Sequence, residues 1–544
     1  MPNTDSFDFD RVVDRHGTYC TQWDYVADRF GHADLLPFTI SDMDVETAPC
    51  IRAALAKRLE HGVFGYSRWN HDDFKGAVSN WFAHRYGASL DPEALVYGPS
   101  VIYIIAQLVS LWSAPGEGVL VHTPAYDAFG NMLAANDRVL LPCPLKNAEG
   151  SYQIDWQCFE QQAARPDCRI LLLCSPHNPT GRVWTRDELG RMAAICQRHG
   201  VKVISDDIHM DVSFARYLPW SEVAEDESWA LVSSGSKSFN IPALGGAYAF
   251  IANAEARAAY LQRLKAAHGL SSPPILGVLA HISAYRDGAA WLDALKTYLH
   301  GNLTQVAARL NAAFPAIDYR VPEGTYLAWI DLRGLGIDTT ERMDALQTLL
   351  VEKYRVAIMR GDTYGPEGTG YIRLNVGCPR SKVDQGLDAL IGALGATCIL
   401  ETTAGRALHG RRKAVVAGLT ALLVLAGGAL LRGVAWTTPH GAPITVALLQ
   451  GNVPQDLKWR PELFDASLRT YYQLALDHPA QLTVLPETAL PAFYGRIPRA
   501  YLETLAGLAR RQDGDLLLGV PTGDSQGYAN SVVSLGNAPS QRYD

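Results

Sequence analysis

A single lysine lies among small hydroxyl residues in the string Ser234–Phe239 (S-G-S-K-S-F), directly after a strand-like segment at 230–233. An amine that forms an imine must be reachable and flexibly tethered, and neighbouring hydroxyl groups can bind a phosphate through hydrogen bonds. Taken alone, such a string is more often an ordinary solvated turn. Lys237 therefore indicates chemistry only if the chain supplies suitable companions elsewhere.

Two polar residues upstream are such companions. Asn178 begins the turn sequence N-P-T-G after a buried strand, where its amide would donate a hydrogen bond to an anionic ring oxygen. Asp206 ends a strand in the string I-S-D-D-I-H, where a carboxylate would pair with a pyridine nitrogen and keep the ring protonated. The positions of these residues and Lys237 are compatible with three successive segments of one sheet. Together they predict a pyridoxal-5'-phosphate (PLP) site.

The elements that would position these residues follow an α/β pattern from Asp8 to about Leu394, in which apolar runs alternate with amphipathic helical stretches. This alternation predicts a largely parallel sheet covered by helices. Ligands bind beyond the carboxyl ends of the strands in such sheets, and Asn178 and Asp206 fall there. We expect strands at 118–122, 170–174, 201–205 and 230–233, and a helix at 186–198 that begins with a capping box of Thr185 and Glu188.

The composition limits the classes of function. A chain of 544 residues predicts two or more domains, and its net charge of -8 gives no reason to expect a nucleic-acid partner. The nine cysteines form no C-x-x-C pair, so we expect neither a disulfide framework nor a metal site, and a reducing compartment fits them best. The first residues do not resemble a signal peptide, which predicts a cytoplasmic location for the first domain.

With these motifs in place, the chain resembles the fold-type I, aspartate-aminotransferase-like PLP enzymes, and within them the MalY/PatB-type carbon–sulfur lyases. The resemblance covers about residues 7–394 and includes the stretches Trp23–Met43 and Ser234–Leu244. It implies a homodimer. It also implies a lyase domain at 1–394, with a large, mostly parallel sheet domain at about 50–285 and a small α/β domain formed by about 1–49 and 286–394.

The same resemblance implies a role for each site residue. Lys237 would bind the cofactor as an imine and act as the catalytic base, Asp206 would pair with the ring nitrogen, and Arg373 would bind the substrate α-carboxylate. The planar fork of arginine suits that last role, although Arg373 by itself could be an ordinary arginine at a strand edge. The other expected cofactor contacts are Asn178 and His209 at the ring hydroxyl, Tyr126 stacked on the ring, and Ser234, Ser236, Ser100, Val101, Ile102 and Tyr66 at the phosphate, with Tyr66 from the neighbouring subunit.

The implied reaction is a β-elimination that converts an amino-acid thioether such as cystathionine into a thiol, pyruvate and ammonia. His209 favours the lyase branch, because most aminotransferases have tyrosine at that position. Arg360–Asp362 stands where the lyases tend to have Pro-Gly, which bears on the substrate entrance and not on the chemistry. Two alternatives stay open: an aminotransferase that uses the same residues, and a regulator that binds a transcriptional activator of the maltose regulon.

After residue 394 the sequence changes character. A linker at 395–413 ends in the basic run Arg411–Lys413, and the apolar run that follows is close to the roughly 20 residues that a membrane-spanning helix needs. The positive-inside rule then predicts that a helix at 414–434 anchors the protein in the inner membrane, with the enzyme domain in the cytoplasm and the C-terminal segment in the periplasm. A buried core helix is the alternative.

A second α/β pattern occupies 443–544, and its strings L-P-E-T-A and Q-G-N-V-P resemble part of the nitrilase-like domain of apolipoprotein N-acyltransferases. Such chemistry needs a glutamate base, a lysine and a cysteine together. Glu487 matches the base, whereas no lysine follows Lys458 and no cysteine follows Cys398. We therefore expect an incomplete domain, from a gene fusion or gene-model join, in which Glu487 is vestigial. Its expected elements are strands at 444–450, 482–485, 516–520 and 531–535 and a helix at 464–476.

Overall fold

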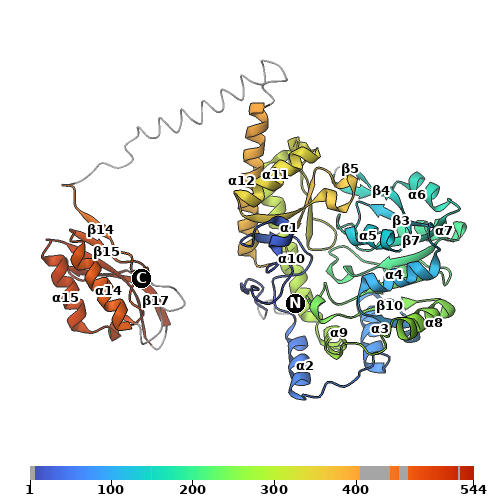
Figure 1. Ribbon diagram of the computed structural model, residues 1–544, viewed down its shortest axis with the longest axis horizontal. Helices are drawn as coiled ribbons and strands as arrows, with labels where there is room; N and C mark the ends of the chain where they lie inside the picture. Colours follow the sequence, from blue (N-terminus) through green and yellow to red (C-terminus); the bar gives the residue numbers. More distant parts are fainter. Residues whose placement is uncertain (1–6, 149, 405–440, 453–463, 525–526, 544) are drawn as a thin grey trace. The chain divides into compact units, whose positions relative to one another are not determined.

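The computed structural model describes residues 7–148, 150–404, 441–452, 464–524 and 527–543. Contacts between backbone positions divide the chain into two compact units, 1–417 and 418–544. Figure 1 draws the first unit from blue to orange and the second in orange-red and red. The predicted limits of the large and small domains within the first unit stay predictions.

The first unit contains a seven-stranded sheet with the order β2-β10-β9-β8-β7-β3-β4. Strand β10 runs antiparallel to both of its neighbours, and the other neighbouring pairs are parallel. The expected largely parallel sheet is thereby confirmed. The strands are β2 (Leu95–Gly98), β3 (Gly118–Thr123), β4 (Val139–Pro144), β7 (Cys168–Cys174), β8 (Lys202–Asp206), β9 (Trp229–Ser233) and β10 (Ala247–Ile251).

Helices cover both faces of this sheet (Figure 1). Successive residues of β7 point to opposite faces: Leu172 belongs to the same apolar cluster as helix α4 (Val101–Trp112), and Leu171 to that of α7 (Arg186–His199). Strands covered on both sides read as continuous apolar runs, which explains the sequence of β7. Helix α7 begins at the predicted capping box of Thr185 and Glu188. Other helices are α2 (Pro49–Glu60), α3 (Asp72–Tyr86), α5 (Asp127–Ala135), α6 (Trp156–Ala163), α8 (Ala254–Gln262) and α9 (Ile275–Asp287).

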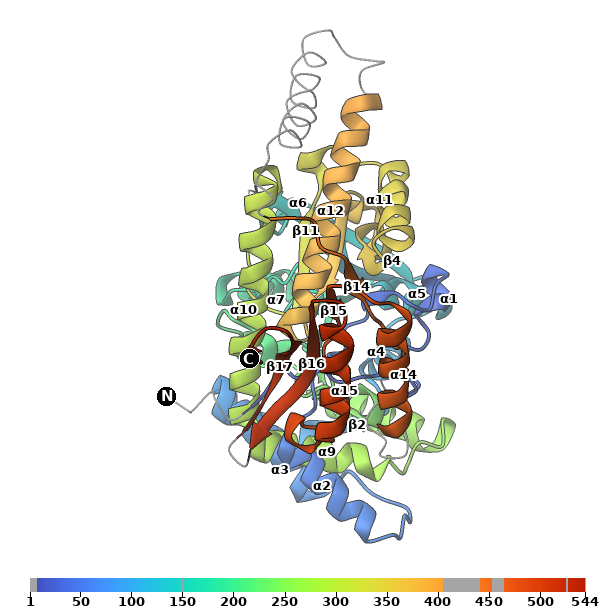
Figure 2. The same ribbon diagram turned by 90° about the vertical axis from the view of Figure 1, so that its left-hand side faces the viewer.

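A four-stranded sheet with the order β1-β12-β13-β11 joins the two ends of the first unit. Strand β1 pairs in parallel with β12, with Leu36 opposite Val356. This pairing brings the residues that follow β1 next to the C-terminal strands. Helices α10 (Ala289–Ala313) and α12 (Arg380–Ala404) lie side by side (Figures 1 and 2). The strands are β1 (Leu36–Phe38), β11 (Leu327–Asp331), β12 (Val356–Arg360) and β13 (Tyr371–Asn375), and α11 spans Thr340–Glu352.

The second unit has a five-stranded sheet with the order β14-β15-β16-β17-β18. Its first three strands are parallel, and β16 and β17 form a long antiparallel hairpin. The predicted strands and helix occur near their expected positions, although the first strand is shorter and the hairpin strands are longer. The elements are β14 (Val446–Leu448), α14 (Phe464–Asp477), β15 (Leu482–Val484), α15 (Arg499–Arg510), β16 (Asp515–Asp524), β17 (Gly527–Gly536) and β18 (Arg542–Tyr543).

The prediction of an inner-membrane anchor requires correction. Among the residues that the structure describes, none of the helices is both long and apolar enough to cross a bilayer. The predicted span, 414–434, lies outside the described residues. Only the length and hydropathy of the run suggested the anchor, because residues 414–431 carry no charge and are close in number to what a bilayer span needs. The membrane-anchored localisation is therefore not retained.

Candidate active site

A cavity of about 200 Å³ lies beyond the carboxyl ends of β7 and β8 and beside the start of α4. It brings together Lys237, Asp206 and Asn178, which come from three separate segments of the chain. Of the predicted cofactor contacts, it is also lined by Tyr126, His209, Ser234, Ser236, Ser100, Val101 and Ile102.

The Lys237 side chain crosses to the segment that follows β1. Its amine donates hydrogen bonds to the Ser41 carbonyl oxygen at 2.7 Å and to the Ser41 hydroxyl oxygen at 3.0 Å. Burial lowers the pKa of the Lys237 amine to about 8, against the attraction of nearby carboxylates. At pH 7 roughly a tenth of the amine is therefore unprotonated, which is the form that acts as a nucleophile or proton acceptor.

Asp206 is the last residue of β8, and 3% of its surface is exposed. The Ile208 backbone N–H donates to its carboxylate at 3.2 Å. Burial raises the pKa of Asp206 to about 7, against the opposing effects of the Ile208 N–H and of Lys237. A buried carboxylate of this kind is stabilised by a cationic partner, so Asp206 fits a protonated ring nitrogen.

Arg373 in β13 lies at the junction of the two sheets of the first unit. Its guanidinium donates to the Asn178 side-chain oxygen at 3.0 Å and to the Thr39 carbonyl at 2.9 Å. None of the described residues is a partner for its buried Nε. The Arg373 guanidinium carbon lies 4.5 Å from the centre of the Tyr364 ring. Arg373 does not line the cavity itself, but it is bonded to a residue that does. The bond also leaves the Asn178 NH₂ group available as a donor.

His209 follows Asp206 by three residues and is fully buried, with a 2% exposed surface. Burial lowers the pKa of its imidazole to about 3, so the ring is neutral. Among the residues that the structure describes, its Nδ1 atom has no hydrogen-bond partner. A neutral imidazole with an unused nitrogen fits the predicted approach to a ring hydroxyl.

The predicted phosphate end is formed by the start of α4 and the loop before Lys237. Ser100 caps α4, and its hydroxyl accepts a hydrogen bond from the Tyr103 backbone N–H at 3.2 Å. The first-turn N–H groups of a helix are a favourable environment for an anion. The Ser234 hydroxyl donates to the Gly246 carbonyl at 2.8 Å and accepts from the Ser236 N–H at 3.1 Å, so Ser234 shapes this loop.

Of the two tyrosines predicted to contact the cofactor, only Tyr126 lines the cavity. Tyr126 lines the cavity and packs edge-on against Phe129, with ring centres 5.7 Å apart. Tyr66 is fully exposed in an irregular segment and does not line the cavity. Its donation by a neighbouring subunit stays a prediction.

Several lining residues were not found from the sequence. Ser41 is the most informative, since it contacts the Lys237 amine. It lies within Trp23–Met43, a stretch that supported the resemblance, but no local motif marks it. Arg360, expected near the substrate entrance, is paired with Asp362 and Asp344. Besides Ser41, the cavity-lining residues that no sequence motif had indicated are Pro99, Cys174, Ile208, Pro242, Gly245 and Gly246.

A larger cavity of about 450 Å³ is lined by Arg182, Arg333 and the segment 317–323. Its three arginines are already paired, Arg182 with Glu323, Arg320 with Asp318 and Arg333 with Asp331. Neither Lys237 nor Asp206 lines this larger cavity. The chemistry of the residues therefore places the candidate site in the smaller cavity.

Asp206 predicts a pH dependence of stability in the cofactor-free protein. In the folded state the pKa of Asp206 is about 7, above the ordinary value of 3.8. The folded protein therefore loses stability as the pH rises from about 4 to about 7, and at higher pH the stability stays at this reduced level. Asp206→Asn cannot ionise, so we expect it to stabilise the cofactor-free protein at alkaline pH by up to about 4 kcal/mol and much less at acid pH. Urea unfolding at both pH values measures this. An equal effect at both would contradict the prediction.

Known proteins resemble the first unit over nearly its whole length. Residues 33–390 match the family described as Aminotransferase class I and II. Protein MalY from Escherichia coli (strain K12) is 57% identical over 392 residues, covering 72% of this chain and 99% of that protein. Cystathionine beta-lyase PatB from Bacillus subtilis (strain 168) is 34% identical over 390 residues, covering 71% and 99%.

Solved structures of PLP-containing proteins are also similar to this chain. Cystalysin from Treponema denticola, which contains a pyridoxal 5'-phosphate cofactor, has a TM-score of 0.68 at 27% identity and covers 72% of this chain and 99% of its own. The PLP-bound C-S lyase from Staphylococcus hominis has a TM-score of 0.67 at 27% identity, covering 71% and 98%. The expected fold-type I architecture is thereby confirmed for the first unit.

A different relative matches a short part of the chain. Apolipoprotein N-acyltransferase from Chromobacterium violaceum is 47% identical over 128 residues. The match covers 23% of this chain and 25% of that enzyme, so the chain spans about a quarter of its length. The resemblance predicted from the strings around Glu487 is confirmed at this partial extent.

Proposed function

We propose a function from the premise that this chain belongs to the class I and II aminotransferase family, whose match extends over residues 33–390. The first unit is a PLP-dependent carbon–sulfur β-lyase that converts an amino-acid thioether into a thiol, pyruvate and ammonia. The observation that carries this proposal is that Lys237, Asp206 and Asn178 meet in one cavity with a neutral His209. The similarity to a cystathionine beta-lyase supports the thioether substrate.

Pyridoxal phosphate, when bound, supplies an electron sink that allows a proton to leave the substrate α-carbon and a thiolate to leave the β-carbon. The Lys237 amine holds the cofactor and, once released, takes the α-proton at Nζ. Asp206 keeps the ring nitrogen protonated through its negative charge. Arg373 orients the substrate by its α-carboxylate, which places the α-proton within reach of Lys237.

The remaining cavity residues hold the cofactor in this proposal. The Asn178 amide and the His209 ring bind the ring hydroxyl, and Tyr126 stacks on the ring. Ser100 and the first turn of α4, together with Ser236, bind the phosphate, and Tyr66 of a second subunit completes this end. A homodimer is part of the proposal for that reason.

An aminotransferase that used the same residues would need a 2-oxo acid as a second substrate, whereas a lyase would not. A lyase releases pyruvate and thiol from cystathionine alone, because elimination needs no second substrate. We expect the purified full-length protein, supplied with PLP, to release both products in equal amounts without any 2-oxo acid. Pyruvate is measured by coupled reduction and thiol by a disulfide reagent. Strict dependence of product formation on an added 2-oxo acid would identify an aminotransferase instead.

This proposal assigns the catalysis to the first unit alone. The second unit is part of a nitrilase-like domain, and in it Glu487 accepts a hydrogen bond from the Asn530 amide at 2.8 Å. The chain provides no lysine after Lys458 and no cysteine after Cys398 to act with this glutamate. Binding of a maltose-regulon activator stays a prediction, because no feature of the described residues favours it.

A further inference from the structure

The segment that follows β1, residues 39–45, contacts each side of the candidate site through its backbone. The Thr39 carbonyl accepts from Arg373, and the Ser41 carbonyl accepts from Lys237. The Asn375 amide donates to the carbonyls of Ile40 and Asp42 at 2.5 and 2.7 Å. The predicted carboxylate clamp and the predicted base are therefore held by carbonyls only two residues apart.

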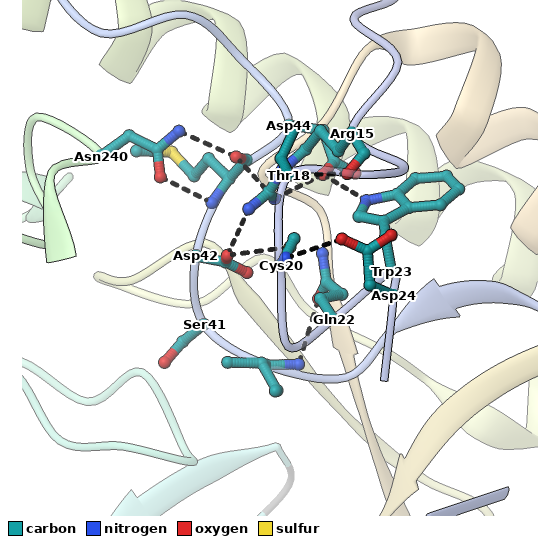
Figure 3. A network of polar contacts seen from close by, with 12 residues as sticks. Arg15, Thr18, Cys20, Gln22, Trp23, Asp24, Ser41, Asp42, Asp44 and Asn240 are labelled. Atoms are coloured by element: carbon teal, nitrogen blue, oxygen red, sulfur yellow. Dashed lines mark hydrogen bonds and ion pairs between the residues drawn. The ribbon is translucent and has the colours of Figure 1, made fainter. Parts of the chain in front are cut away.

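Ser41 makes the contacts that matter most for the reaction. Its carbonyl and its hydroxyl both accept from the Lys237 amine, at 2.7 and 3.0 Å, and Tyr326 donates to the same carbonyl at 2.7 Å. Ser41 also lines the cavity. Figure 3 shows its side chain directed away from the ion pairs of the neighbouring residues. The two acceptors fix where the amine lies when no covalent bond holds it.

A partly buried ionic network anchors this segment on its other side (Figure 3). Arg15 pairs with Asp42 at 2.7 Å and with Asp44 at 2.8 Å, and Lys382 pairs with Asp44. The Trp23 indole N–H donates to Asp44 at 2.8 Å. Two acids and two bases balance one another, which lets charged groups stay at a poorly solvated position.

Residues 43–45 are also hydrogen-bonded to the loop that carries Lys237. The Asn240 side chain accepts from the Met43 N–H at 2.9 Å and donates to the Met43 and Val45 carbonyls, each at 2.8 Å. Asn240 follows Lys237 by three residues, so one amide ties the loop that carries the amine to the segment that receives it. Movement of this segment would therefore displace the amine from its acceptors.

Asp42 has a second oxygen that the network does not use. Its Oδ1 is buried and has no hydrogen-bond partner within the described part of the chain, whereas Oδ2 contacts Arg15. The charged groups that act on the Lys237 amine are Asp42 and Asp206, which favour the ammonium form, and Arg373, which opposes it. His209 also lies near the amine but is neutral. Asp42 is the strongest of these charge effects on Lys237.

We propose that Ser41 and Asp42 form a dock for the Lys237 amine. Ser41 is a further catalytic residue, because it holds the reacting amine whenever that amine is not bonded to the cofactor. Asp42, anchored by Arg15, is a positioning residue that fixes Ser41 and supplies negative charge. This inference rests on the proposed function, since it assumes that Lys237 is the residue that bonds the cofactor.

The test measures the rate at which PLP forms its bond to Lys237 in full-length protein from which the cofactor has first been removed. Coupling needs the neutral amine, so its rate rises with pH to a plateau, with a midpoint near the Lys237 pKa of about 8. We expect Asp42→Asn to lower this midpoint by about 0.5 to 1 pH unit, because the attraction that favours the ammonium form is lost. Asp42→Glu should restore it. Asp24→Asn is the matched control, since among the described residues Asp24 accepts from backbone N–H groups such as those of Gly17 and Cys20. Its midpoint should equal that of the unaltered protein.

Ser41→Ala provides a second, independent arm, because the Ser41 side chain takes no part in the ion pairs. We expect kcat to fall about 10-fold through loss of one hydrogen bond to a charged amine, with KM nearly unchanged. A normal midpoint in folded Asp42→Asn, or a normal midpoint and kcat in Ser41→Ala, would overturn the dock. If Asp42→Asn does not fold, Ser41→Ala alone decides. Absence of coupling in the unaltered protein would instead refute the proposed function.

Discussion

Lys237→Ala protein should show no visible absorbance from covalently held PLP and at least about 1000-fold slower release of thiol from cystathionine. The expected loss is large because one amine performs two tasks, holding the cofactor and moving the α-proton. No other lysine lines the cavity among the described residues, so no neighbour can replace it. Absorbance spectra and the coupled pyruvate assay measure the two effects separately.

Lys353→Ala is the matched control for this substitution. Lys353 is exposed at the end of α11 and contacts the Tyr354 ring. Its loss should leave both the absorbance and the rate unchanged. Retention of the covalent cofactor band in Lys237→Ala protein would show that another amine bonds the cofactor, and the assignment of the site would then be wrong.

Arg373→Leu protein should have a kcat/KM for cystathionine that is lower by about 100- to 1000-fold, mostly through a higher KM. The substrate carboxylate loses a paired, charge-assisted contact in a buried setting, which typically costs about 3 to 4 kcal/mol. Cofactor absorbance should persist, because Lys237 is unaltered. Arg373→Lys should recover only part of the loss, since an ammonium lacks the planar fork.

Arg360 offers a control on the neighbouring strand. Its guanidinium is paired with Asp344 and Asp362, whereas that of Arg373 is bonded to Asn178, which lines the cavity. Arg360→Leu should therefore change kcat/KM by less than about 3-fold, as expected for a partly exposed ion pair. Similar losses in Arg360→Leu and Arg373→Leu would mean that the effect arises from strand packing and not from carboxylate binding.

The chemical type of the site could be predicted from local strings. Lys237, Asp206 and Asn178 each lie at or just beyond the end of a buried strand, and the apolar runs that form those strands are visible in the sequence. The capping box of Thr185 and Glu188 likewise marks the start of α7. Parallel strands bring their carboxyl ends to one edge of a sheet, so these local signals were enough to predict that the three residues meet.

The membrane anchor shows the limit of such reasoning. An apolar run at 414–434 satisfied the length of a bilayer span, and the described residues contain no helix that meets the full requirement. Length and lack of charge are properties of a segment alone. Whether such a segment is covered by protein or by lipid depends on its surroundings, which the segment does not encode by itself.

By itself, the sequence determined the α/β class of the first unit, the resemblance to PLP enzymes and the three central site residues. Only the tertiary structure decided that Ser41 receives the Lys237 amine, that Arg373 bonds to Asn178, and that Arg15 anchors Asp42. The physical reason is separation along the chain. Strand β1 pairs with β12 some 320 residues later, and contacts that depend on such a pairing leave no periodic or local pattern to read.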